Sequence, residues 1–160
     1  MNLRRFIGKI RACWNILRSK AYPSFSQAGE DQIVRYLFTS LNISRPTFLD
    51  IGTNDPIIGN NTYSLYLRGS RGVCVEPDNR LCDKIKRVRP EDILLRMGVG
   101  LEANGEADLY VFPDKYHSWN TFSKNDADKK VYESGIKVLK IDKVPLITIN
   151  EIVNLYFSET

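Results

Sequence analysis

Residues 47–56 read Thr-Phe-Leu-Asp-Ile-Gly-Thr-Asn-Asp-Pro, and residues 72–77 read Gly-Val-Cys-Val-Glu-Pro. Each stretch contains a short apolar run that leads into a carboxylate, Asp50 in the first and Glu76 in the second. Short apolar runs closed by glycine or proline are typical of buried strands. Two parallel strands would place these carboxylates side by side at their carboxyl ends, where open α/β sheets bind ligands.

The two acidic residues favour a nucleoside ligand. A carboxylate after the second strand can accept hydrogen bonds from the ribose hydroxyls, and Gly52 lets the backbone approach a ligand closely. A dinucleotide is disfavoured, because no G-x-G-x-x-G phosphate loop follows the first strand. Asp50 and Asp55 also place negative charge where a pyrophosphate would lie, whereas the sulfonium and ammonium groups of S-adenosylmethionine are cationic. The sequence therefore favours S-adenosylmethionine as cofactor.

A family resemblance rests on the order and spacing of six short segments. They are Ser26-Gln-Ala-Gly-Glu-Asp-Gln32, Phe48-Leu-Asp-Ile-Gly-Thr-Asn-Asp-Pro56, Asn61-Thr62-Tyr63, Arg68-Gly69-Ser70-Arg71-Gly72, Val75-Glu76-Pro77 and Thr121-Phe122-Ser123. In these segments the chain resembles the FkbM-type methyltransferases of the class I S-adenosylmethionine fold. The resemblance implies a Rossmann-like three-layer α/β sandwich and O-methylation of a hydroxyl on a sugar, glycan or other small metabolite.

The cofactor contacts expected from this comparison of motifs come from the two strand ends and the loop between them. The expected residues are Asp50, Gly52, Thr53, Asn54, Thr62, Glu76 and Pro77. Asp50 and Gly52 would shape the donor loop, while Glu76 would hold the ribose. Asn54 and Thr62 would hydrogen-bond the methionine end of the donor, together with the N-terminus of a helix that begins at residues 60–62 and ends at Leu67.

The resemblance also implies an incomplete domain. In the FkbM type, an Asp-Val-Glu-Gly stretch at the end of a fourth parallel strand follows the helix that begins here near Thr148. The sequence ends at Thr160 before such a stretch, so we expect residues 26–160 to form the N-terminal part of a methyltransferase domain with an incomplete sheet. The catalytic residues stay unassigned. The alternative is a truncated or degenerate domain that binds nucleosides, or mediates interactions, without catalysis.

The positive charge is concentrated at the N-terminus. Residues 1–20 hold six of the 23 basic residues and none of the 19 acidic ones, which leaves 17 basic against 19 acidic residues elsewhere. This distribution argues against a nucleic-acid groove across the domain. Apolar residues at helical spacing predict an amphipathic helix over residues 1–20, which either contacts an anionic membrane surface as a peripheral anchor or packs on its own domain.

Cysteine and histidine usage gives no support to a metal site. The three cysteines have no C-x-x-C spacing, and His117 is the only histidine. No apolar run approaches the length of a membrane span, and no signal peptide is recognised. We therefore expect reduced thiols and a cytoplasmic, or membrane-peripheral, protein.

The remaining chain predicts further helices and strands. Helices are expected from Ser26 to about Leu41, over residues 79–88 and from Thr148, where Thr148 and Glu151 form a capping box. Strands are expected over residues 93–100, 107–112, 136–141 and 144–147. The basic side chains of the helix over 79–88 and its end are expected to be solvated; they are Lys84, Lys86, Arg87 and Arg89.

Two features near the third strand leave alternatives open. Gly98 and Gly100 would leave room for the adenine ring, or they mark a bulge or turn. Residues 113–128 are polar, aperiodic and rich in aromatic residues, which is typical of a lid over a functional site. Within this segment, His117 is either a general base or a solvated loop residue.

Overall fold

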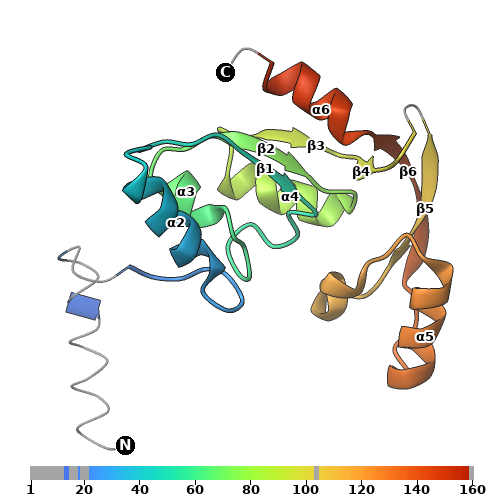
Figure 1. The fold of residues 1–160 in the computed structure, drawn as a ribbon. Helices are drawn as coiled ribbons and strands as arrows, with labels where there is room; N and C mark the ends of the chain where they lie inside the picture. Colours follow the sequence, from blue (N-terminus) through green and yellow to red (C-terminus); the bar gives the residue numbers. More distant parts are fainter. Residues whose placement is uncertain (1–12, 15–17, 19–21, 103–104, 159–160) are drawn as a thin grey trace, which may run out of the picture.

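The computed structural model describes residues 13–14, 18, 22–102 and 105–158, which form a mixed α/β fold (Figure 1). The predicted N-terminal helix over residues 1–20 therefore lies almost entirely outside the described residues. Within the described part of the chain, no helix has the length and apolar character needed to cross a membrane.

Residues 47–56 and 72–77 contain neighbouring parallel strands, as predicted. Strand β1 (Phe48–Ile51) pairs with β2 (Gly72–Val75), and β2 pairs with β3 (Ile93–Leu95), so that β2 is central. The register sets Asp50 opposite Cys74. Because side chains alternate between the faces of a strand, Cys74 and Glu76 lie on one face together with Asp50.

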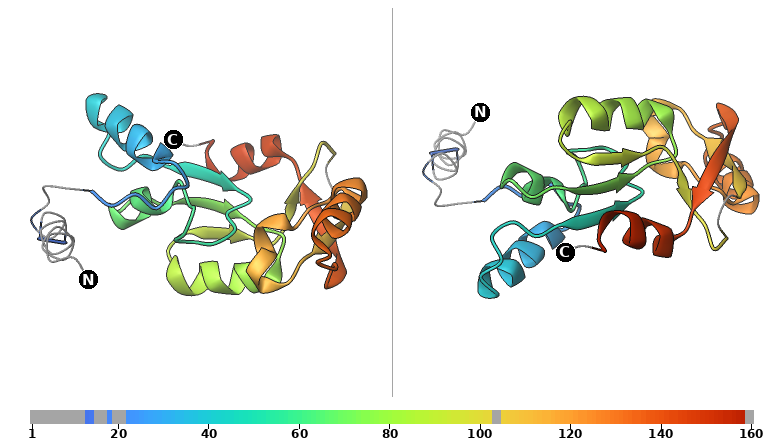
Figure 2. Two further views of the ribbon diagram at one scale, coloured as in Figure 1. Left: turned by 90° about the horizontal axis from the view of Figure 1, so that it is seen from below. Right: turned by 90° about the horizontal axis from the view of Figure 1, so that it is seen from above.

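Helices cover both faces of this sheet (Figure 2). Helix α4 (Asn79–Val88) and the short α3 (Tyr63–Leu67) pack on the face of Cys74, and α6 (Ile149–Tyr156) packs on the face of Val73 and Val75. Helix α2 (Glu30–Ser40) joins the first layer. The first core consists of Phe48, Leu65, Cys74 and Ile85, and the second consists of Val73, Val75, Ile147 and Ile152. Two apolar layers thus fix the ends of β1 and β2.

A second sheet contains β4 (Gly98–Val99), β6 (Lys140–Ile147) and β5 (Glu106–Val111) in that order. Strand β4 is parallel to β6, whereas β5 is antiparallel to it. The single strand predicted over residues 93–100 is therefore two strands in different sheets. The two strands predicted over 136–141 and 144–147 are one, because the β5 ladder continues across Asp142 and Lys143. That pairing partner is distant in sequence, so local alternation could not reveal it.

Helix α5 (Lys124–Ser134) was not predicted. It begins after Ser123, whose Oγ accepts a hydrogen bond from the amide of Asp126 at 3.2 Å, and it ends at Gly135 with a φ of 73°. Among its residues only Ala127 is buried, so it lacks the apolar stripe on which the prediction of helices rested. Its capping serine and C-terminal glycine were the available signals. The segment predicted as a lid thus contains the 3-10 helix η1 (Asp114–Trp119) and the start of α5.

The other helices match their predictions to different degrees. Helix α4 has the predicted bounds, and α6 has the predicted capping box of Thr148 and Glu151. Helix α2 begins at Glu30 instead of Ser26. The reason is that Ser26 Oγ accepts from the amide of Gly29 at 3.0 Å and donates to the buried Asp31 at 2.9 Å. Those bonds stabilise a turn before the helix in place of its first turn.

Candidate functional site

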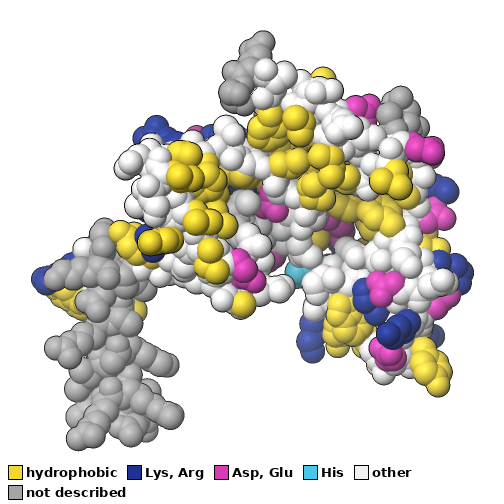
Figure 3. Space-filling view, in the orientation of Figure 1, with side chains coloured by type: hydrophobic (Ala, Val, Ile, Leu, Met, Phe, Trp, Pro, Cys, Tyr) yellow, Lys and Arg dark blue, Asp and Glu magenta, His cyan; other side chains and the backbone are white. Residues whose placement is uncertain are grey.

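A cavity of about 410 Å³ lies between the carboxyl ends of β1 and β2 and the segment around η1. In Figure 3 this region appears as a hollow between the two parts of the molecule. Its lining residues are Ile51, Gly52, Asn54, Val75, Glu76, Pro77, Leu81, Met97, Gly98, Val99, Leu109, His117, Ser118, Asn120 and Phe122. The predicted strand-end crevice is therefore a real concavity, and none of these lining residues is a lysine or an arginine.

Glu76 is the buried acid of this cavity, with 4% of its surface exposed. One carboxylate oxygen accepts from the amide of Asn54 at 2.8 Å and the other from the amide of Asp78 at 2.9 Å. A carboxylate has about four acceptor positions, so two remain for a ligand. Burial, with a smaller contribution from the charges of Asp78 and Asp50, raises the pKa of Glu76 to about 7, against the lowering effect of the two amides.

The loop after β1 curls around the end of β2. The amide of Gly52 donates to the carbonyl of Val75 at 2.8 Å, and Gly52 has a φ of 68°, which favours glycine. Asn54 also has a positive φ, 56°, which asparagine tolerates better than most residues. Its Oδ1 is buried and has no hydrogen-bond partner among the described residues. An unpartnered buried acceptor in a cavity wall is suited to a ligand's N–H or O–H group.

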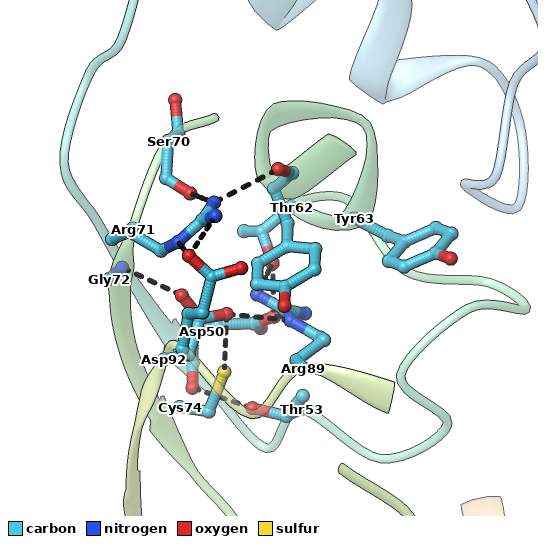
Figure 4. Close-up of polar contacts among 12 residues, drawn as sticks. Asp50, Thr53, Thr62, Tyr63, Ser70, Arg71, Gly72, Cys74, Arg89 and Asp92 are labelled. Carbon is cyan, nitrogen blue, oxygen red and sulfur yellow. Dashed lines mark hydrogen bonds and ion pairs between the residues drawn. The ribbon is translucent and has the colours of Figure 1, made fainter. Parts of the chain in front are cut away.

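Asp50 belongs to a polar network behind the cavity wall (Figure 4). Its Oδ2 accepts from Thr62 Oγ1 at 2.6 Å and from Asn60 Nδ2 at 3.3 Å, and it lies 3.5 Å from an Nη atom of Arg89. Arg89 in turn donates through Nε to Asp92 at 2.8 Å. The network ties the end of β1 to α3 and to the end of α4, so it holds the cavity wall in place.

The prediction that the Arg89 side chain is solvated is wrong. Arg89 was grouped with the solvated basic residues of the helix, but its side chain is completely buried. It lies four residues after the buried Ile85, and residues at this spacing share one face of a helix. That spacing was a usable signal, since a guanidinium on a buried face needs carboxylate partners, and Asp92 follows three residues later.

The structure brings four of the seven predicted cofactor residues into the cavity wall and leaves the others outside it. Gly52, Asn54, Glu76 and Pro77 line the cavity, whereas Asp50, Thr53 and Thr62 do not. Thr53 is buried and donates through Oγ1 to the carbonyl of Asp50 at 3.0 Å. The carboxylates of the two strand ends therefore do not converge on one ligand, because the Asp50 carboxylate is engaged by Thr62, Asn60 and Arg89.

The N-terminus of α3 differs from the expected anion-binding site. The amides of Thr62 and Tyr63 donate to Asn60 Oδ1 at 3.0 and 2.8 Å. These donors are consequently already satisfied within the chain. The N-cap residue is Thr62, one of the three predicted starts of this helix, and the Asn60 side chain caps the first turn from two residues before it.

The glycines after β3 are required by packing within the protein. A Cβ at Gly98 would lie 2.6 Å from Phe122 Cζ and 2.8 Å from Leu146 Cδ2, and one at Gly100 would lie 2.9 Å from Leu146 Cδ1. Side chains thus occupy the Cβ positions of both glycines, while Gly98 itself lines the cavity and Gly100 does not. The expectation of an adenine ring beside these glycines stays a prediction for Gly98 alone.

The segment predicted as a lid forms the far wall of the cavity. Asn120 fixes it to α4, because its Nδ2 donates to Asp78 at 2.8 Å while its Oδ1 accepts from the amide of Phe112 at 2.8 Å. His117 lines the cavity, and its buried Nδ1 has no hydrogen-bond partner within the described part of the chain. The sequence identified His117 as a candidate base but gave no signal for the anchoring role of Asn120.

Two further findings bear on identity. Among the described residues, no group of three or more histidine, cysteine, aspartate or glutamate side chains could hold a metal ion. Comparisons of the chain with protein-family models, with curated proteins and with solved structures give no match.

Proposed function

We propose that this chain is an S-adenosylmethionine-dependent methyltransferase of the FkbM type, with a Rossmann-like fold, that methylates a hydroxyl of a sugar, glycan or other small metabolite. The family resemblance of six sequence segments motivates the proposal. The parallel order of β1, β2 and β3 and the cavity at their carboxyl ends support it, because ligands of open α/β sheets bind there.

The observation that carries the proposal is the state of Glu76. It is a buried carboxylate at the end of the second strand, it lines the cavity, and two of its acceptor positions are free for ribose hydroxyls. Among the described residues, the cavity wall has no lysine or arginine to neutralise a pyrophosphate. It therefore suits a cationic nucleoside such as S-adenosylmethionine better than a nicotinamide dinucleotide.

The lining residues divide into donor-binding and proton-accepting groups. Glu76 holds the ribose, and Asn54 Oδ1 accepts a hydrogen bond from the donor's ammonium group. The bound donor supplies an electrophilic methyl carbon. The imidazole of His117 would accept the proton that the acceptor hydroxyl loses as its oxygen bonds to the methyl carbon. The methyl–sulfur bond would break and release neutral S-adenosylhomocysteine, so charge and atoms balance. Asn120 keeps His117 in the wall by fixing the surrounding segment to α4.

Binding of S-adenosylhomocysteine tests the proposal. We expect calorimetric titration of the 160-residue chain to show saturable binding of S-adenosylhomocysteine and none of NAD. Glu76→Ala should weaken S-adenosylhomocysteine by about 1–3 kcal/mol, since a charged acceptor is lost. Binding of NAD alone, or equal affinity of the wild type and the Glu76 variant, would reject the assignment of the cavity.

A second candidate function is an interaction domain that binds a nucleoside without catalysis. Exposed apolar side chains on α2 favour it, since Ile33, Tyr36 and Leu37 are 64%, 70% and 53% exposed, and such residues often belong to interfaces. The two functions differ in turnover, which is measured as formation of S-adenosylhomocysteine from S-adenosylmethionine in the presence of neutral or anionic sugars. A chain that binds S-adenosylhomocysteine but forms none with any of these sugars would favour the interaction domain.

A further inference from the structure

A second hollow, of about 300 Å³, adjoins the donor cavity. It is formed by α4, the loop after β1 and η1, and its lining residues are Asp55, Arg80, Leu81, Lys84, Arg87, Asp114 and His117. Leu81 and His117 line both hollows. A ligand in the second hollow would therefore lie next to His117, the proposed proton acceptor, which also lines the donor cavity.

Two of the three cations in this hollow are already paired. Lys84 forms an ion pair with Asp55, and Arg80 pairs with both Asp78 and Asp114. These pairs neutralise the acids that would repel an anion. They also hold the two cations within the wall. Because the charges of Lys84 and Arg80 are already compensated, neither cation by itself indicates an anionic ligand.

Arg87 is different, because no ion pair compensates its charge among the described residues. Its Nε donates to the carbonyl of Asp83 at 3.2 Å, and its two Nη atoms donate to no described group. That bond to the helix backbone orients the guanidinium and leaves its terminal donors free. A guanidinium with two free Nη groups matches the two oxygens of a carboxylate or phosphate.

The surrounding surface adds to the positive potential. A shallow depression next to the hollow is lined by Arg80, Asp83, Lys86, Arg87 and Arg96. Arg96 pairs with Asp83, while Lys86, which is exposed, has no ion pair among the described residues. Arg87 lines both concavities, so an anion drawn to either one lies against the same guanidinium.

We propose that the hollow between α4 and η1 binds the anionic group of the acceptor, a phosphate or carboxylate on a sugar-sized molecule, through Arg87. This inference rests on the proposed methyltransferase function and narrows its substrate class. With the anion held at Arg87, a hydroxyl of the same molecule reaches His117, which the two cavities share. Neutral acceptors lack the group that the hollow selects.

The test is a binding comparison with three probes of equal ring size, namely glucose 6-phosphate, glucuronate and glucose. We expect the 160-residue chain, without donor, to bind one or both anions at least about tenfold more tightly than glucose. The phosphate and carboxylate arms identify which anion is preferred. Equal affinity for all three probes would overturn the proposal.

Two charge-matched variants locate the effect. Arg87→Gln should reduce the affinity for the preferred anion about tenfold or more. Lys137→Gln removes the same charge from an exposed position that lies outside both concavities, and it should change that affinity less than about twofold. An equal loss in both variants would show a diffuse surface field and refute the site. Because Arg87 is exposed, circular dichroism should show both variants folded like the wild type.

The result of the anion-binding test can be distinguished from the result of the donor-binding test. Anion binding that depends on Arg87 in a chain that does not bind S-adenosylhomocysteine would disprove the methyltransferase function and retain the anion site. Binding of S-adenosylhomocysteine without any preference for anions would overturn this inference alone.

Discussion

The pH dependence of the Glu76→Gln variant tests the buried carboxylate that organises the donor cavity. Burial raises the pKa of Glu76 from its ordinary value of 4.5 to about 7. At about 1.4 kcal/mol for each pH unit, this corresponds to about 3 kcal/mol. A raised pKa means that the folded state binds the proton more tightly than the unfolded state. The associated stability is therefore fully present below pH 4.5 and is lost as the pH rises through about 7.

Glutamine cannot ionise, so the variant lacks this loss. We expect the free energy of unfolding of Glu76→Gln, minus that of the wild type, to increase by about 3 kcal/mol between pH 4.5 and pH 8. Urea denaturation at several pH values across this window measures the difference. The absolute offset depends on how well the glutamine amide replaces the bonds to Asn54 and Asp78, but its change with pH does not.

A matched control is Glu102→Gln, at an exposed glutamate. The difference between this variant and the wild type should vary with pH by less than about 1 kcal/mol. If the Glu76→Gln difference is equally flat, the Glu76 carboxyl group is not held in a desolvated position, and the reasoning about the cavity fails.

The affinity for the donor is a second test of the Glu76 carboxyl group, and we expect it to rise with pH where the stability falls. Ribose hydroxyls donate to the charged carboxylate, so donor binding must displace the proton from Glu76. Affinity for S-adenosylhomocysteine should therefore fall about tenfold from pH 8 to pH 6 in the wild type, and should not follow this curve in Glu76→Gln. A wild-type affinity that is constant over this range would place the ribose elsewhere.

Two further predictions concern the scaffold of the site, and urea denaturation at neutral pH measures both. Arg89→Met should destabilise the fold by about 3–5 kcal/mol, because it leaves two carboxylates of the buried network without their counter-ion, whereas Arg87→Met on the exposed side of the same helix should cost less than about 1 kcal/mol. Equal effects would mean that Arg89 is solvated. Gly72→Ala should destabilise by about 1–3 kcal/mol, because its Cβ would lie 2.3 Å from the carbonyl oxygen of Phe48. Gly105→Ala, whose Cβ meets no atom of the described residues closer than 3.6 Å, should cost less, and a reversed order would contradict the close approach of β1 and β2.

Local sequence patterns were enough to predict the first sheet. The apolar runs that end at Asp50 and Glu76, the proline after Glu76 and the helical pattern over residues 79–88 are local signals. They identified β1, β2 and α4 and the cavity at the strand ends. The periodicity of neighbouring residues indicates a buried strand or an amphipathic helix, which is why these elements could be predicted.

Tertiary structure alone decided how the polar groups divide between the cavity and its support. Asp50 and Glu76 look equivalent in the sequence, yet the first binds Thr62 and Arg89 behind the wall and the second faces the cavity. The difference depends on partners far away in sequence, and a buried charge must find such partners wherever the fold supplies them. For the same reason β6 could not be predicted as one strand, because its continuity comes from pairing with β5.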